Sequence, residues 1–139
     1  MVSMVKYNAF IDQIAAGGHN LKTDTIKCAL TAATPNAGTD TTMSYAPPTN
    51  VSGYPSGGNT LTTTSAATSG GLFTLKLADS VFTGGVAPGI GPFRYAVLYN
   101  SSKGNALIGY YDYGISTQLG NTETLTVDFD DTNGALTIA

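Results

Sequence analysis

The stretch that decides the fold reads Phe93-Arg-Tyr-Ala-Val-Leu-Tyr99. It is apolar at nearly every position, with Arg94 as the exception. A strand with one solvent-exposed face would instead alternate between apolar and polar residues. A run of this kind is typical of a central strand that is covered on both faces. The sequence therefore predicts a layered protein built around this strand.

Further strands are predicted before and after this segment. Residues 24–34 alternate and place Ile26, Cys28 and Leu30 on one face of a half-buried strand, and residues 72–77 and 122–129 alternate in the same way. After a turn at residues 100–105, residues 106–113 form a tyrosine-rich strand. Asn133-Gly134 is a two-residue hairpin signal, so residues 135–138 are expected to return as the final strand.

The N-terminal part of the chain carries a single helix signal. Apolar residues recur at helical spacing, and a glycine pair follows them: Tyr7, Phe10, Ile11 and Ile14, then Gly17 and Gly18. Residues 35–69 are instead poor in apolar residues and rich in Thr, Ser, Gly, Asn and Pro. This composition predicts a long loop region, in which the segment around Leu61 is the one candidate strand.

Together these elements predict a mainly β protein, either an antiparallel β-sandwich or a jelly-roll-like, partly closed barrel, with a short N-terminal helix. A length of 139 residues fits one domain with one core. In that domain, residues 1–20 form the helix-bearing N-terminal segment, residues 35–69 the long loop region, and residues 71–139 the main strands.

Charge is scarce along the chain. Six basic and nine acidic residues make up 11% of the sequence, against roughly 25% in an ordinary soluble domain. The surface must therefore be covered largely by Thr, Ser, Asn, Gly and Tyr, which meet another protein at a lower desolvation cost than Lys or Glu. The net charge of −3 and the scattered basic residues argue against nucleic-acid binding. No apolar run reaches membrane-spanning length, and residues 1–10 do not have the pattern of a signal peptide, so we expect synthesis in the cytoplasm.

The residues that most often carry chemistry have structural explanations here. His19 is the only histidine and is expected in a loop or cap, while Cys28 is the only cysteine and lies on the apolar face of its predicted strand. Asp128, Asp130 and Asp131 could offer oxygen ligands to calcium, although acidic residues next to a turn usually bond the local backbone. We therefore expect no enzymatic activity and no cofactor.

Aromatic residues give the remaining hint of function. In strands they favour cross-strand packing, and those that face outward supply the rigid, amphipathic contact area found at protein interfaces. The predicted interface residues are Tyr7, Phe10, Tyr45, Tyr54, Tyr110, Tyr111 and Tyr113. Tyr110 and Tyr111 are neighbours in one strand, so they must face opposite sides of the sheet.

Several segments resemble, in order, those of a family of small tailed-bacteriophage virion proteins. They are Lys6-Tyr-Asn-Ala-Phe-Ile11, His19-Asn-Leu-Lys-Thr-Asp-Thr-Ile-Lys27, Gly57-Gly-Asn59, Gly91-Pro-Phe-Arg-Tyr-Ala-Val-Leu-Tyr-Asn100, Leu107-Ile-Gly-Tyr-Tyr-Asp-Tyr-Gly114 and Thr126-Val-Asp-Phe-Asp130. The resemblance spans nearly the whole chain, and its motifs belong to the fold and not to a reaction.

This resemblance implies a place on a phage particle, with head decoration (cement) as the favoured role. The expected partners are the major capsid protein and copies of the chain itself in a small homo-oligomer on the capsid surface. The alternative is a tail or baseplate component, with host-surface or carbohydrate binding by exposed tyrosines. A small hydrolase is the third hypothesis, and it needs a site that the sequence does not display.

Overall fold

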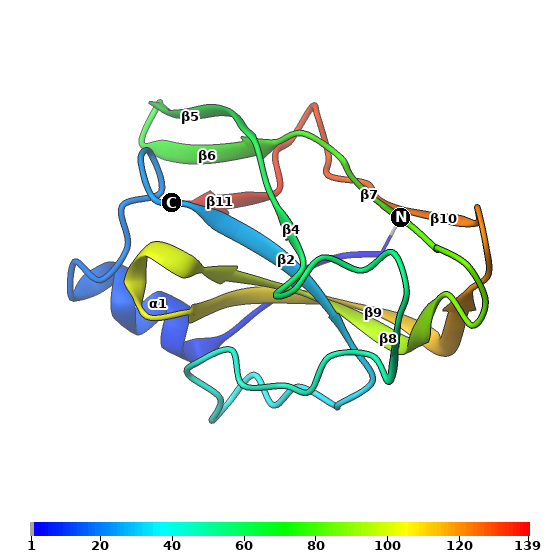
Figure 1. Cartoon of the computed structure of the whole chain (residues 1–139). Coiled ribbons are helices and arrows are strands. Elements are labelled where there is room, and N and C mark those ends of the chain that lie inside the picture. Colours follow the sequence, from blue (N-terminus) through cyan, green and yellow to red (C-terminus); the bar gives the residue numbers. More distant parts are fainter. Residues whose placement is uncertain (1) are drawn as a thin grey trace.

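The computed structural model describes residues 2–139, which form a mainly β, antiparallel, β-sandwich-like fold with one short α-helix (Figure 1). The fold class predicted from the sequence is therefore confirmed. The largest sheet has the order β1-β9-β8-β2-β4, and β3 pairs with the beginning of β8. Its strands are β1 (Val5–Lys6), β2 (Ile26–Thr31), β3 (Asn50–Val51), β4 (Asn59–Thr60), β8 (Ile90–Asn100) and β9 (Ala106–Leu119).

Strand β8 lies in the middle of this sheet, between β2 and β9, as its apolar sequence predicts. Successive residues Ala96, Val97 and Leu98 are all fully buried, so both faces of the strand are covered. The prediction for the neighbouring β2 needs correction, because Ala29 and Thr31 on its second face are also buried. The strand is therefore buried on both faces over most of its length and is not half-buried.

A second sheet has the order β11-β6-β5 and consists of β5 (Thr63–Ser69), β6 (Leu72–Leu77) and β11 (Leu136–Ile138). The predicted strand 72–77 coincides with β6. Within the predicted loop region 35–69, the short β4 lies next to Leu61, but the loop prediction is wrong at β3 and at β5, which forms a hairpin with β6. Gly70 and Gly71 make the two-residue turn, with φ values of 57° and 80°. Positive φ at both positions defines the primed turn that glycine favours.

A third, two-stranded sheet pairs β7 (Ser80–Thr83) with β10 (Thr124–Val127). The hairpin predicted at Asn133-Gly134 is not formed, because β11 pairs with β6 and not with β10. Asp130 explains the difference, since its carboxylate accepts hydrogen bonds from the backbone N–H groups of Thr132 and Asn133. This local turn redirects the chain from one sheet to the next.

Helix α1 (Asn8–Ala15) confirms the predicted N-terminal helix, and Gly17 follows it with a φ of 77°. Phe10 is fully buried, but Ile11 is 52% exposed, so the apolar face is narrower than the sequence suggested. A short 3-10 helix, η1 (Ser101–Lys103), occupies the predicted turn between β8 and β9.

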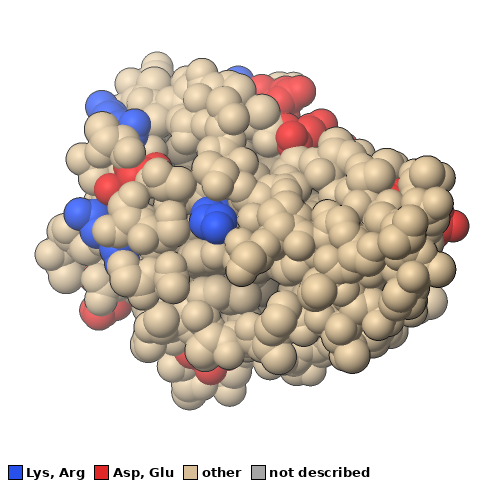
Figure 2. Space-filling model, viewed as in Figure 1, with Lys and Arg blue, Asp and Glu red and all other residues tan. Residues whose placement is uncertain are grey.

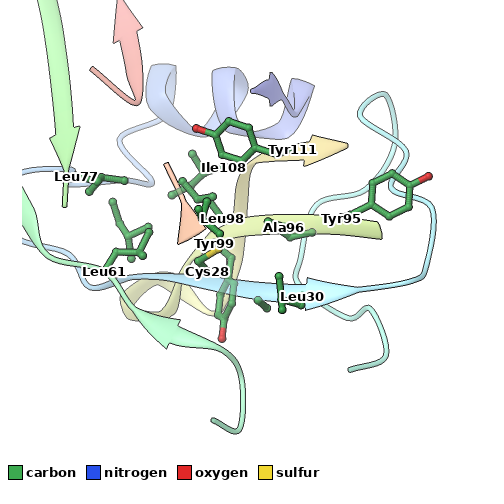
Figure 3. Close-up of a cluster of buried hydrophobic side chains, with 14 of the residues drawn as sticks. Cys28, Leu30, Leu61, Leu77, Tyr95, Ala96, Leu98, Tyr99, Ile108 and Tyr111 are labelled. Carbon is green, nitrogen blue, oxygen red and sulfur yellow. The ribbon is translucent and has the colours of Figure 1, made fainter. Parts of the chain in front are cut away.

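The core lies between the sheets and forms one contiguous cluster of buried side chains. Leu98, Cys28 and Ile108 of the main sheet meet Leu77 of the second sheet and Leu61 in this cluster (Figure 3). In Figure 1 the two smaller sheets lie above the main sheet, and α1 and the cyan segment that follows β2 lie below it. These layers explain why the central strand is apolar at successive positions.

Candidate interaction surface

The structure divides the predicted interface residues into two groups. Tyr7, Phe10 and Tyr111 are core residues, with exposed fractions of 0%, 0% and 6%. Tyr111 packs edge-to-face on Phe129, with ring centroids 6.0 Å apart. Tyr7 and Phe10 offer no surface to a partner of the folded chain and Tyr111 offers almost none, so the prediction is wrong for them. The other four, Tyr45, Tyr54, Tyr110 and Tyr113, are half-buried.

The hydroxyl of Tyr45 is held within the chain. It donates a hydrogen bond of 2.5 Å to the Asp40 carboxylate, and it lies 3.0 Å from the hydroxyl of Tyr7. The same carboxylate accepts the backbone N–H of Asn36 at 2.8 Å. Tyr45 therefore fastens the segment after β2 to the start of α1, and only part of its ring reaches the surface.

The hydrogen bond from Tyr45 lowers the pKa of the Asp40 carboxyl below its ordinary value, and the bond from Asn36 acts in the same direction. We expect Tyr45→Phe to raise the pKa of Asp40 toward that of a free aspartate. A carboxyl with a lowered folded-state pKa stabilises the fold above its unfolded pKa, and this contribution is lost as the pH falls through the folded pKa. The stability difference between wild type and variant should therefore be largest near neutral pH and should shrink in acid.

Carbon-detected NMR titration of Asp40, together with urea unfolding at several pH values, measures both effects. Tyr113→Phe is the matched control, because the Tyr113 hydroxyl makes no hydrogen bond to any residue of the described chain. An unchanged Asp40 pKa in Tyr45→Phe would show that this hydrogen bond is not formed in solution.

Tyr54 also has a mainly structural role. Its hydroxyl accepts the backbone N–H of Leu30 at 3.0 Å, and its ring stacks on Phe82 with centroids 5.8 Å apart. Close by, the hydroxyl of Tyr99 donates to the carbonyl of Gly57 at 2.6 Å. Both hydrogen bonds tie the segment that leads into β4 to the central strands β2 and β8.

Tyr110 and Tyr113 keep hydroxyls without a partner in residues 2–139. Tyr110 packs against Tyr7, with centroids 5.4 Å apart, while Tyr111 packs against Phe129, so the two neighbours face opposite sides as expected. Burial raises the pKa of Tyr113 to about 12, which keeps its hydroxyl neutral. A depression of about 190 Å³ is lined by Val2, Tyr111, Tyr113, Thr126, Val127 and Asp128.

Arg94 and Asp112 neutralise each other beside these tyrosines. The guanidinium donates two hydrogen bonds to the carboxylate, at 2.7 and 3.0 Å, and lies 5.2 Å from the centroid of the Tyr95 ring. The side chains are 43% and 37% exposed, so the pair belongs to the surface. It adds little net charge to a surface that is already poor in charge.

His19 lies in the loop between α1 and β2, as predicted. Its Nδ1 atom is 3.0 Å from the Asn100 amide nitrogen, which also donates to Asp24 at 2.8 Å, and its ring packs on Phe10. Burial lowers the pKa of His19 and favours the neutral ring. Cys28 is fully buried, and burial raises the pKa of its thiol to about 12, so it is core filler as predicted.

The acidic turn uses its oxygens locally. The Asp130 carboxylate accepts two backbone N–H groups and the side-chain amide of Asn133, at 2.7 to 2.9 Å, and these bonds lower its pKa. Across residues 2–139, no group of three or more His, Cys, Asp or Glu side chains is placed to hold a metal ion. This bonding is the turn chemistry that the sequence suggested as the alternative to calcium.

Two surface features were missed in the sequence. Apolar side chains stand exposed at Val51 in β3, Val81 in β7, Val86 in the glycine-rich loop before β8, and Ile115 in β9. The second feature is the open edge of β5, which the Gly70-Gly71 pair could have revealed as part of a hairpin. Figure 2 shows a broad face on which charged side chains are sparse and lie mainly toward its margins.

No protein-family model matches the chain, and neither a curated protein nor a solved structure matches it. Within residues 2–139, no helix combines the length and the apolar character that a membrane crossing requires.

Proposed function

We propose that the chain is a structural protein of a tailed-phage particle and that it binds the outer surface of the head as a decoration protein. The observation that carries this proposal is the surface itself. The 139-residue chain contains only six basic and nine acidic residues. Many of the other exposed residues are Thr, Ser, Gly and Ala. Such a surface can be covered by protein over a wide area without stripping water from many charges.

The resemblance of six segments to small virion proteins supplies the phage context. The geometry adds support, because the residues behind that resemblance build the scaffold. Phe93 and Leu98 lie in β8, Tyr111 packs on Phe129, and Gly58 lies against the backbone of β2. A protein whose role is assembly needs a rigid scaffold and a wide contact surface. It does not need a set of catalytic side chains.

On this proposal the exposed valines take part in the contact with the capsid. Val86 is 71% exposed and follows Gly85, whose N–H donates to Ser52, the residue after exposed Val51. The two apolar side chains therefore belong to adjoining segments. Val86→Asp is expected to leave the fold intact and to weaken binding to particles by roughly tenfold or more, since a buried uncompensated charge opposes association.

Purified particles that lack the chain, mixed with recombinant protein and sedimented, test this proposal. Wild-type protein should sediment with the particles at a stoichiometric and saturable ratio. Val86→Thr serves as the matched control, because it keeps the shape of the side chain and adds no charge. Failure of the wild-type chain to bind any part of the particle would contradict the proposal.

A tail or baseplate role with carbohydrate binding is the second candidate, and one observation favours it. The small depression beside β9 and β10 combines the Tyr113 ring with the Asp128 carboxylate. Aromatic rings and carboxylates are the groups that contact sugar C–H faces and hydroxyls. Gold labelling confined to tails, together with loss of host-cell binding in Tyr113→Ala, would favour this candidate over the head.

A further inference from the structure

We propose that the chain forms a two-fold symmetric dimer through the open edge of β5, with Ala67 opposite Ala67 of a second copy. This inference concerns the isolated chain in solution and holds independently of the virion proposal. It begins from the position of β5 at the end of the β11-β6-β5 sheet. Apart from its pairing with β6, no backbone hydrogen bond to residues 63–69 is formed by any other part of residues 2–139.

Strand β5 is unlike the other edge strands of the described chain. It has seven residues, whereas β1 and β4 have two, β11 has three, and β7 and β10 have four each. Natural proteins protect long edges with lysine, proline, bulges or a covering element. Residues 63–69 read Thr-Thr-Ser-Ala-Ala-Thr-Ser, with no charge and no proline, and the one irregularity lies at the start, between Thr63 and Ser65.

The hairpin turn fixes which backbone groups point outward. In a two-residue hairpin the residues that flank the turn exchange hydrogen bonds, so Ser69 bonds Leu72 and the bonded positions then alternate along the strand. Ser65, Ala67 and Ser69 therefore bond β6, while the N–H and C=O groups of Ala66 and Thr68 point to the open edge. This regular register holds from Ser65 to Ser69.

An identical strand fits this edge. Two antiparallel copies related by a two-fold axis at Ala67 place Ala66 opposite Thr68, and Ser65 opposite Ser69. The outward groups of Ala66 and Thr68 then satisfy one another with about four backbone hydrogen bonds. Ala67 and Ser65 are exposed and small, so no bulky or charged side chains oppose each other across the axis. The two three-stranded sheets become one continuous sheet.

The hairpin is also free to be approached. A Cβ atom built on Gly70 or Gly71 meets nothing within 4 Å, so the turn projects from the rest of the chain. In Figure 1 the β5–β6 hairpin lies at the upper margin of the molecule, with β5 outermost. A second copy of the chain always carries the same open β5 edge. A different partner protein would need an unpaired strand of similar composition.

Cysteine cross-linking tests the register. Opposed Ala67 residues form a non-hydrogen-bonded pair with Cα atoms about 4.5 Å apart, within the range that a disulfide spans. Ala67→Cys should therefore form a covalent dimer on mild oxidation. Ser65→Cys and Ser69→Cys are the matched controls, because like residues would lie about 14 Å apart. Each should stay monomeric alone and cross-link only when the two are mixed. Native Cys28 is fully buried and does not interfere.

Sedimentation equilibrium over a concentration series reaching about 0.5 mM tests the association without a cross-link. Wild type should approach twice the 14.2 kDa chain mass. Thr68→Pro removes an outward N–H that β6 does not use, and should raise the dimer dissociation constant by roughly 10- to 100-fold. Thr68→Val keeps the N–H and the branched side chain, and should dimerise like wild type.

Two results would overturn the inference: wild type that stays monomeric across the whole series, or Ser65→Cys that cross-links alone as readily as Ala67→Cys. If wild type is monomeric and Thr68→Pro also abolishes binding to phage particles, the β5 edge pairs with a strand of another virion protein. Loss of particle binding with an intact dimer would instead count against the proposed function alone.

Discussion

Replacing Phe82 with alanine is expected to lower the free energy of unfolding by about 3–5 kcal/mol. Phe82 points from β7 into the core with 1% of its surface exposed, and its ring stacks on Tyr54 at an interplanar angle of 20°. Strand β7 pairs only with β10, so this ring is a main link between the small sheet and the rest of the core. Its loss leaves a cavity that the surrounding side chains fill only in part.

Val81→Ala is the matched control for this prediction. Val81 is the neighbour of Phe82 in the same strand but is 51% exposed, so its truncation should change stability by about 0.5 kcal/mol or less. Urea unfolding of both variants measures the difference. Similar losses in the two variants would mean that β7 does not present Phe82 to the core.

The second large effect is expected at Gly58, where Gly58→Ala should cost about 2–4 kcal/mol. The residue has a φ of 86°, which an L side chain rarely adopts. In addition, an added Cβ would lie 2.7 Å from the Cα of Ala29 and would overlap the carbonyl oxygen of Cys28. These contacts are with the backbone of buried β2, so relief requires β4 to move away from the sheet.

Gly17→Ala separates the cost of the positive φ from the cost of the steric overlap with β2. Gly17 has a similar φ of 77°, but a Cβ there meets nothing within 4 Å. It should therefore show only the backbone cost, about 1 kcal/mol. Equal destabilisation of both variants in urea unfolding would contradict the close approach of Gly58 to β2.

The sequence predicted the elements whose pattern is set by burial. The continuous apolar run at residues 93–99 correctly placed β8 in the middle of a covered sheet, and the alternation at residues 72–77 matched β6. Helix α1 was found because apolar residues recurred at its period and Gly17 ended it. In each case the local pattern and the final packing agree.

The sequence-based predictions were wrong where tertiary contacts determine the local conformation or the burial of a residue. Strand β5 carries almost no apolar signal, because only Ala66 turns toward the core, and its strand conformation comes from pairing with β6. At Asn133-Gly134 the preference for a tight hairpin lost to the hydrogen bonds of Asp130 and to the pairing of β11 with β6. Burial of Tyr7 and Tyr111 likewise depends on which neighbouring elements pack over them. The residue type alone does not determine that packing.

The same reasoning separates scaffold from surface in the candidate site. Among the tyrosines, Tyr45 and Tyr54 use their hydroxyls to bond other parts of the chain. Tyr113, the exposed valines and the β5 edge remain as the proposed contact surfaces, and a sequence pattern alone predicts only the first of them. A contact surface consists of the side chains and strand edges that the fold leaves uncovered. It can therefore be identified only once the fold is known.

The central proposal, that the chain decorates the head of a tailed phage, is tested most directly by a density map of tailed-phage particles assembled in cells that produce the chain. We predict density for the β-sandwich-like chain at regular lattice positions on the outside of the head, with the charge-poor surface against the major capsid protein. Particles that contain no copy of the chain, or density for it only in the tail, would contradict the assignment to the head.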